Sequence, residues 1–180
     1  MLRPLIRSRL KVDERRLGGS LEYLRHILRV SLRSFFKFIR IVPLAKYRRT
    51  LPPGPYHVAR IVATRDEDCG TCVQMAVNLA KQDGVATAHL RSVLDRKPEN
   101  LPDDLADAYR FAEGVVTASG AENDLRQKIR ERHGEEALVE MALAIAVCRV
   151  FPITKRALGY AVSCSDVQIE GLEESQNAKS

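Results

Sequence analysis

The sequence predicts an all-α protein. Apolar residues return every three or four positions along most of the 180-residue chain, which is the spacing of one helix face. No alternating apolar and polar run is longer than about four residues, so a β-sheet is not expected. Asp, Pro and Gly residues stand between the periodic segments, where helices begin and end.

Length and composition predict a single globular domain with an ordinary core. Hydrophobic residues make up 45% of the 180 residues, which is enough to bury a core without metal or disulfide support. The sequence contains no run of about 18 apolar residues that would predict a membrane-spanning helix. The first residues also lack the apolar segment of a secretory signal. We therefore expect a cytoplasmic protein in a reducing compartment.

The net charge of +6 is distributed unevenly along the chain. Residues 1–50 hold 14 Lys and Arg against three acids, a net charge of +11, whereas residues 51–180 hold 15 against 20, a net charge of −5. Between the two parts lies the strongest break in the sequence, residues 51–55 (LPPGP). We predict a basic N-terminal arm over residues 1–50 and a helical domain over residues 51–165.

The basic arm contains a predicted amphipathic helix. Residues 1–19 end in two glycines and are expected to be a mobile or loosely docked lead-in. Ser20 can cap a helix whose apolar positions continue to Ile39, and Pro43 should bend or end that helix. Along one side of it the cationic residues step by four: Arg25, Arg29, Arg33 and Lys37.

This cationic helix has three alternative uses. Phe and Ile beside Arg and Lys favour peripheral contact with an anionic membrane through residues 20–49. Positive charge alone is weak evidence for nucleic-acid binding, so nucleic acid is not an expected partner. The default is a docking helix whose apolar face packs on its own domain or on a neighbouring subunit.

The remaining helices follow from apolar periodicity and from start and stop signals. We expect helices over residues 56–64, 69–82, 89–94, 103–115, 122–132 and 135–150, with a loop at residues 97–102. The Ala-rich segment 135–150 has few polar positions and should be central. Pro152 should end it, with a last turn or two over residues 154–162. The polar tail, residues 166–180, is expected to be disordered.

The most informative motif is the pair Cys69 and Cys72, at the start of the predicted helix 69–82. Thiols react as thiolates, and the unpaired N–H groups at a helix N-terminus favour that charge. The neighbouring acids have the opposite effect on the thiol pKa, although Asp66 or Asp68 could instead cap the helix. Two cysteines three residues apart in a first turn can close a disulfide, so the motif predicts redox chemistry.

Cysteines can also have two structural roles, as zinc ligands or as residues of the hydrophobic core. A zinc site would need a second pair of ligands, and the sequence shows none, so no bound metal is expected. Buried cysteines can also be ordinary core residues, which is the better explanation of Cys148 in the apolar helix. Cys164 lies beyond the last strong helix and has no predicted role.

Residues 57–84, around the segment Asp66-Glu67-Asp68-Cys69-Gly70-Thr71-Cys72, resemble the alkylhydroperoxidase-like (AhpD-like) branch of the carboxymuconolactone decarboxylase superfamily. Residues 109–113 and 133–140 are similar to its second half, so the resemblance covers roughly residues 50–160. It implies an all-helical homo-oligomer that reduces peroxides or disulfides, with no bound cofactor and with electrons from a lipoyl-type or other thiol donor. It also implies that Cys72 attacks and Cys69 resolves, whereas the helix dipole alone favours Cys69.

The chain departs from this family at its proton relay. Ala76 stands where the family has a histidine four residues after the second cysteine, and His57 stands where it has a glutamate twelve residues before the first. His57 is the candidate proton acceptor, because a neutral imidazole beside a thiol can take its proton. Glu67 is a weaker candidate, since an acid before a helix start is first of all a cap.

The predicted site is therefore Cys69 and Cys72, with His57 as tentative proton acceptor. The predicted function is a thiol-dependent oxidoreductase that reduces peroxides or disulfides. The alternative is a non-catalytic member of the same family, a redox-sensing or structural oligomeric module that has lost the relay.

Overall fold

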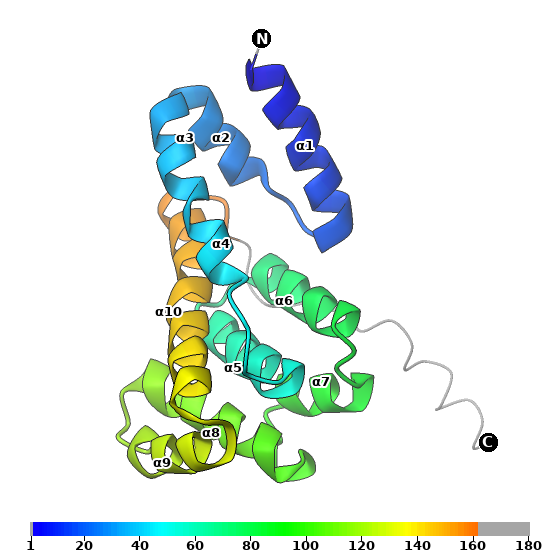
Figure 1. Ribbon diagram of the computed structural model, residues 1–180. Helices are drawn as coiled ribbons and strands as arrows, with labels where there is room; N and C mark the ends of the chain where they lie inside the picture. Colours follow the sequence, from blue (N-terminus) through cyan, green and yellow to red (C-terminus); the bar gives the residue numbers. More distant parts are fainter. Residues whose placement is uncertain (1, 162–180) are drawn as a thin grey trace, which may run out of the picture.

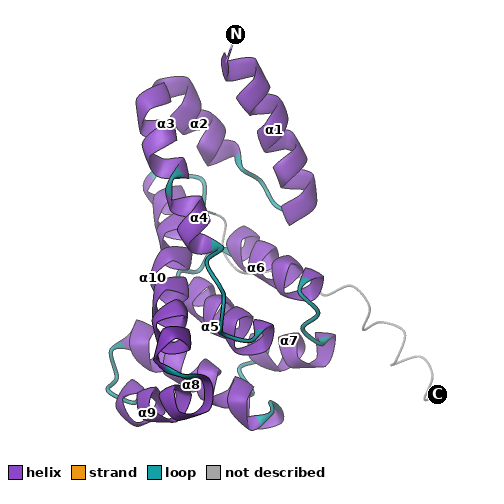
Figure 2. Cartoon of the chain, in the orientation of Figure 1, coloured by secondary structure: helices purple, strands orange, loops and turns teal. Residues whose placement is uncertain are grey.

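The protein is built from helices alone throughout the part that the structure describes. The structure, a computed structural model, describes residues 2–161, so Cys164 and the predicted tail 166–180 lie outside it. Within residues 2–161 there is no strand, which confirms the all-α prediction (Figure 2).

The helices divide between the basic arm and the rest of the chain. The arm contains α1 (Leu2–Leu17), α2 (Glu22–Val30), α3 (Leu32–Ile39) and α4 (Ile41–Ala45). The rest contains α5 (Pro53–Asp66), α6 (Gly70–Gln82), α7 (Thr87–Leu94), the 3-10 turn η1 (Pro98–Asn100), α8 (Asp103–Thr117), α9 (Glu122–His133) and α10 (Glu135–Ala157). The predicted helices of residues 69–132 are confirmed to within a few residues at their ends.

Helix α5 lies at the centre of the main hydrophobic core. It contacts α6, α7, α8 and α10, and Val58, Ile61 and Val62 on it are almost completely buried. Buried residues of α6, α8 and α10 complete the same cluster. Helix α10 contacts α4 in the arm as well as α5 and α9, and it runs along one side of the molecule (Figure 1).

The arm has a hydrophobic cluster of its own. Its buried members are Leu10, Leu21, Tyr23, Leu24, Leu28 and Phe35. Met75 of α6 and Tyr160 after α10 pack against this cluster, so the arm is docked on the rest of the protein. In Figure 1 the helices α1–α3 gather at one end of the molecule and α7–α9 at the other. The domain boundary near residue 50 stays a prediction.

The predicted loose lead-in at residues 1–19 is wrong, because Leu2–Leu17 form α1. The end of this helix is held by the side chain of Asn78, which donates to the Leu17 carbonyl at 3.0 Å. The Glu14 carboxylate also accepts two hydrogen bonds from Arg25 of α2, at 2.7 and 2.8 Å. These polar contacts join α1 to two neighbouring helices, and no pattern in the sequence specifies them.

The predicted single helix of the arm is interrupted at Ser31. This residue has an extended backbone (φ −148°, ψ 109°), and its hydroxyl accepts a hydrogen bond from the Ser34 N–H at 3.1 Å. Ser31 therefore ends α2 and caps α3. The break turns the apolar faces of both helices onto one cluster, which a straight helix would not allow.

The prediction that Pro152 ends the long apolar helix is wrong. Helix α10 continues through Pro152 to Ala157. A proline inside a helix removes one backbone hydrogen bond, at a cost of about 3 kcal/mol. The helix packs on the arm on both sides of the proline: the Phe151 ring lies edge-on to Phe38 with centroids 6.0 Å apart, and Lys155 Nζ lies 5.4 Å from the centroid of the Tyr23 ring. Packing against the arm offsets the local cost and extends the helix by more than a turn.

By length and composition, α10 is the one described helix that could cross a membrane, whereas no such helix was expected from the sequence. Half of the most apolar 18-residue stretch of this helix is buried inside the protein. The core helix of a soluble protein can be equally long and apolar, and α10 packs on α4, α5 and α9 as a core helix does.

A buried carboxylate on α10 holds the segment that joins the arm to α5. Glu140 has no exposed surface, and its oxygens accept hydrogen bonds from the backbone N–H groups of Arg49 (2.9 Å), Thr50 (3.0 Å) and Leu51 (2.9 Å). Burial raises the pKa of Glu140, but these hydrogen bonds outweigh it and hold the pKa below its ordinary value. The ionised carboxylate thus acts as a cap for a segment without regular structure.

Replacing Glu140 by Gln should destabilise the protein by about 3 kcal/mol, because the amide NH₂ group would face backbone donors. A carboxyl with a lowered pKa stabilises the fold above its unfolded pKa and loses this effect as the pH falls through its folded pKa. The variant should therefore lose less stability than the wild type between neutral and acid pH. Urea unfolding followed by circular dichroism at both pH values measures the two effects.

Glu136→Gln is the matched control, since Glu136 lies on the same helix and is exposed. It should change the free energy of unfolding by no more than about 0.5 kcal/mol. Equal stability of Glu140→Gln and the wild type at neutral pH would contradict the role assigned to the buried carboxylate.

Candidate redox site

The two cysteines of the motif lie together at the start of α6. Cys69 is the residue before the helix, with an extended backbone, and its carbonyl accepts the N–H groups of Cys72 and Val73 at 2.9 and 3.0 Å. The Cys69 and Cys72 sulfurs are 2.7 Å apart, and both residues are free thiols. A disulfide needs sulfurs about 2.05 Å apart, so a small movement would allow the bond to form.

Neither acid expected to cap α6 does so. Asp66 is the last residue of α5, and Asp68 has a left-handed backbone (φ 44°) in the turn between the helices. Aspartate tolerates this conformation better than most residues. The sharp turn brings Cys69 to the position before the helix, and no side chain caps α6 there.

The arm covers the dithiol. A Cβ atom on Gly19 would lie 2.5 Å from the Met75 side chain and 2.9 Å from that of Thr71, so the turn between α1 and α2 packs directly on the first turns of α6. Cys69 is completely buried and Cys72 is 7% exposed. Within the described part of the chain, both cysteines are therefore almost fully covered, and Cys72 is the one with some exposed surface.

A cavity of about 290 Å³ lies next to the dithiol. It is lined by Ser20, Glu22, Tyr23, Thr71, Lys155, Gly159, Tyr160 and Ala161. Thr71 stands between the two cysteines in the sequence, and Tyr23 and Lys155 come from α2 and α10. Three distant parts of the chain thus meet at one small space whose surface is more apolar than polar.

Lys155 is the cation of this site. It is only 3% exposed, and its Nζ lies 5.4 Å from the centroid of the Tyr23 ring, which is a cation–π arrangement. Among the described residues, Lys155 forms no salt bridge with a carboxylate. A buried ammonium group needs a compensating charge, and the thiolate of the dithiol can supply it.

The electrostatics of the pair favour one thiolate, on Cys69. The pKa of Cys69 is lowered by the hydrogen bond from the Cys72 thiol, which outweighs burial, and also by the Cys72 N–H and by the charges of Lys155 and Arg156. The pKa of Cys72 is raised, because it holds the shared proton and is buried. The pKa of Tyr23 is also raised, by burial and by the neighbouring thiols.

The acidic residues before the dithiol are neutralised by arginines of α10. Glu67 is nearly buried and forms ion pairs with Arg149 at 2.5 Å and with Arg156 at 3.3 Å. Asp66 also pairs with Arg149, at 3.3 Å. The sequence left open whether repulsion from these acids or the helix start would dominate, and the arginines remove most of the repulsion. Glu67, held by two arginines, is poorly placed to act as a base.

The structure does not bring His57 to the dithiol. Its Nε2 donates to the Asp83 carboxylate at 2.8 Å, and Asp83 follows the last residue of α6. Helix α6 has 13 residues, so His57 and the cysteines are separated by roughly 20 Å. The expected direct transfer of a thiol proton to His57 does not fit this geometry.

His57 instead has a structural environment at the far end of α6. Burial is the main cause of its lowered pKa, although the bond to Asp83 acts in the opposite direction. Its Nδ1 is buried and has no hydrogen-bond partner. At the other relay position Ala76 is buried in α6, and it offers no titratable group. Neither position supplies a proton relay.

The remaining cysteine with described surroundings is a core residue. Cys148 is 6% exposed in the main hydrophobic cluster, as the sequence predicted, and burial raises the pKa of its thiol. Among residues 2–161 no group of His, Cys, Asp and Glu side chains could hold a metal ion.

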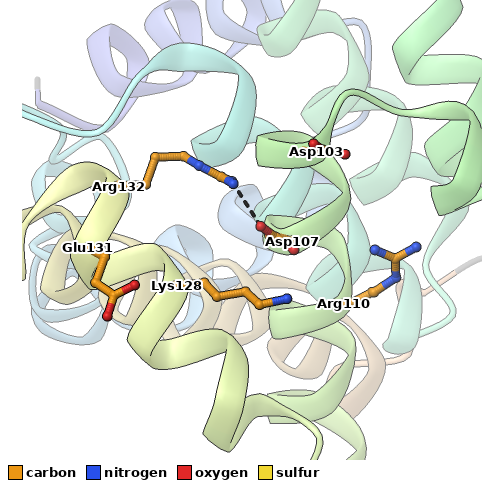
Figure 3. A pocket seen from close by; sticks show the side chains of 6 residues that line it. All are labelled: Asp103, Asp107, Arg110, Lys128, Glu131 and Arg132. Carbon is orange, nitrogen blue, oxygen red and sulfur yellow. Dashed lines mark hydrogen bonds and ion pairs between the residues drawn. The ribbon is translucent and has the colours of Figure 1, made fainter.

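A wider and more open cleft lies elsewhere, between α8 and α9 (Figure 3). It encloses about 720 Å³ and is lined by Asp103, Asp107, Arg110, Lys128, Glu131 and Arg132. Three acids and three bases balance, and Asp107 is already paired with Arg132 at 2.9 Å. This cleft contains no thiol and no unpaired buried group, so the dithiol remains the candidate site.

Comparisons of the chain with protein families, with characterised proteins and with solved structures gave no match. The likeness to the AhpD-like branch therefore depends on the residues of the motif and its neighbourhood.

Sequence reasoning found the two thiols but missed Tyr23 and Lys155. Both residues are distant from the motif along the chain, and Lys155 lies beyond the proline that was expected to end its helix. A basic residue in a mostly apolar helix is only a faint signal, and nothing in the sequence indicates that its ammonium group is buried.

Replacing Lys155 by Met should raise the pKa of the first thiol to ionise by about one pH unit, because the nearest cation is lost and the side-chain volume is kept. The thiolate absorbance of the reduced protein, measured against pH in a Cys164→Ser background, reports this shift without requiring access to the sulfurs. Lys155→Arg should retain most of the wild-type profile.

Lys128→Met is the matched control, since Lys128 is exposed on α9, far from the thiols. It should leave the profile unchanged. Identical profiles for Lys155→Met and the wild type would show that Lys155 does not stabilise the thiolate.

Proposed function

We propose that the chain is a dithiol oxidoreductase of the AhpD-like type, in which Cys69 and Cys72 alternate between dithiol and disulfide. The observation that supports this most directly is the pair of thiols 2.7 Å apart at the start of α6, beside the buried ammonium group of Lys155. The adjacent cavity of about 290 Å³ has room for a small oxidant. The cytoplasmic location and the homo-oligomer expected from the resemblance belong to the same proposal.

Peroxide reduction at this site would take two steps. The thiolate sulfur attacks one peroxide oxygen, an S–O bond forms, the O–O bond breaks, and the leaving alkoxide takes up a proton to give an alcohol. The second thiol then attacks the sulfenic acid, the S–S bond forms, and water leaves. Two electrons pass from the two sulfurs to the peroxide.

Reduction of the disulfide returns the site to its starting state. An external dithiol, of the lipoyl type or another thiol donor, attacks one sulfur as a thiolate and forms a mixed disulfide. Its second sulfur then displaces the protein thiol, so the donor leaves as a disulfide after giving two electrons and two protons. The same exchange in reverse would reduce a disulfide substrate.

The order of attack is also part of the proposal. Cys69 has the lower pKa, but Cys72 is the more exposed of the two residues. Cys72 also stands at the position of the attacking cysteine in the resembled family. Because the pair shares one proton, transfer of that proton over 2.7 Å places the negative charge on Cys72. We assign Cys69 as the resting thiolate and Cys72 as the sulfur that meets the oxidant.

A redox-sensing module is the second candidate, and one observation favours it. Both thiols are covered by the arm, and the family's relay positions hold Ala76 and a distant His57. A sensor needs one oxidation and a change in conformation, whereas an enzyme needs repeated access for oxidant and donor.

Oxidation of the reduced protein by an alkyl hydroperoxide and by oxidised lipoamide tests the proposal, with Cys164→Ser as background. We expect oxidation at least about tenfold faster than that of free cysteine at neutral pH, because more of the dithiol is ionised. Mass spectrometry should find a Cys69–Cys72 disulfide. Cys69→Ser should stop at a sulfenic acid or mixed disulfide, and Cys72→Ser should react slowly.

Cys148→Ser is the control for a thiol outside the site, and it should leave the rate unchanged. A dithiol that reacts no faster than free cysteine with either oxidant would exclude the enzyme. Rapid formation of the disulfide without repeated turnover on dihydrolipoamide would instead support the sensor.

A further inference from the structure

The exposed large apolar side chains of the protein are concentrated on the arm. Eleven such residues are found among the described residues, and seven of them lie in the arm: Leu2, Leu5, Val12, Val30, Phe36, Leu44 and Tyr47. Residues 2–47 make up less than a third of the described chain. Scattered exposed apolar residues are normal, but five of these seven belong to α1–α3, which lie at one end of the molecule, and such an accumulation indicates an interaction surface (Figure 1).

The same end of the molecule is strongly cationic. Residues 1–50 contain 14 Lys and Arg, and 12 of these side chains are exposed. Of the three acids in this segment, Glu14 and Glu22 are both paired with Arg25, at 2.7 and 2.6 Å. The net charge of +11 on residues 1–50 therefore lies mostly on exposed side chains.

Helix α3 shows how the two properties combine. Arg33 lies three and four residues before Phe36 and Lys37, and Arg40 lies four and three residues after them, so the four share one side of α3 and its C-terminal end. All four are exposed, and we call them the α3 outer face. The opposite side of α3 packs through Phe35 into the arm cluster. Among the described residues, no cation of the α3 outer face forms an ion pair. An aromatic ring is thus surrounded by three unpaired cations.

We propose that the outer surface of the arm, with the α3 outer face at its centre, binds an anionic lipid surface. Cations attract the negative headgroups, and exposed Phe, Leu and Val side chains gain free energy by entering the boundary between headgroups and acyl chains. Residues 51–161 hold 14 Lys and Arg against 16 acids, a net charge of −2, so the rest of the described chain offers no comparable attraction to anionic lipid.

The apolar residues distinguish lipid from the other partners that a basic surface fits. Nucleic-acid phosphates would bind the cations, but exposed Leu2, Leu5 and Val30 would gain nothing from contact with phosphate. A second copy of the chain could cover the apolar residues, but two arms of +11 would repel one another. Anionic lipid satisfies both the charges and the apolar side chains.

Co-flotation of the reduced full-length protein with vesicles tests the proposal. We expect binding to vesicles of phosphatidylcholine containing phosphatidylserine as the minor lipid, weak binding to phosphatidylcholine alone, and loss of binding at high salt. Each cation near the surface contributes about 1 kcal/mol. Replacing Arg33, Lys37 and Arg40 together by Gln should therefore weaken partitioning on the order of 100-fold.

The control removes the same charge from the other end of the molecule. Arg91, Lys97 and Lys128 are exposed and form no ion pair among the described residues, so the triple Gln variant at these positions should bind as the wild type does, within a few-fold. Phe36→Ser should weaken binding, whereas Val139→Ser, at an exposed apolar position on α10, should not. Circular dichroism verifies that each variant is folded.

Three outcomes would overturn the proposal. The first is no binding of the wild type to the anionic vesicles at low salt. The second is an equal loss in the two triple variants, which would mean that net charge alone matters. The third is a different occupant, shown either by tighter binding to a short nucleic-acid duplex than to vesicles, or by self-association in sedimentation that Phe36→Ser abolishes. None of these measurements depends on the chemistry of the dithiol.

Discussion

The continuation of α10 through Pro152 is the constraint on which the site depends. The last turns of this helix carry Lys155 and Arg156, and Arg149 lies one turn before the proline. If the helix ended at Pro152, nothing in the sequence would hold Lys155 against the dithiol. The missing backbone hydrogen bond is offset by contacts that lie beyond the proline, namely the Lys155 ammonium group over the Tyr23 ring and the Arg156 ion pair with Glu67. Packing of the arm and electrostatics of the thiols thus depend on the same helix.

The buried ammonium group links the charge of the dithiol to its oxidation state. In the reduced site one thiolate compensates Lys155, which is 3% exposed. In the proposed reaction, disulfide formation would remove that negative charge and leave a buried cation whose partner among the described residues is the Tyr23 ring. Because an uncompensated buried charge is costly, this arrangement stabilises the dithiol relative to the disulfide. The oxidised protein is consequently the more reactive partner in exchange with an external thiol.

The sequence predicted those features that depend on neighbouring residues. The boundaries of α7, α8 and α9 follow from Pro, Asp and Gly signals, and the dithiol follows from the spacing of two cysteines. The features that it did not predict depend on contacts between residues that are far apart in the sequence. The resemblance puts His57 at a relay position of the family, but the 14-residue helix α5 carries His57 and Cys69 to opposite ends of α6. Tyr23 and Lys155 reach the site through tertiary packing that no local pattern records.

Helix α2 has one side at the dithiol and another at the surface proposed for lipid. Tyr23 lines the cavity beside Thr71, while Arg29 and Val30 are exposed. The arm could lie on α6, as in this structure, or move away from it. A lipid surface increases access to the thiols only if it binds the second position of the arm more tightly, because equal affinity for both positions does not shift the equilibrium between them. If such a difference exists, linkage requires that it act in both directions. Movement of the arm off α6 would then raise the affinity for lipid by the same factor by which lipid favours opening of the site.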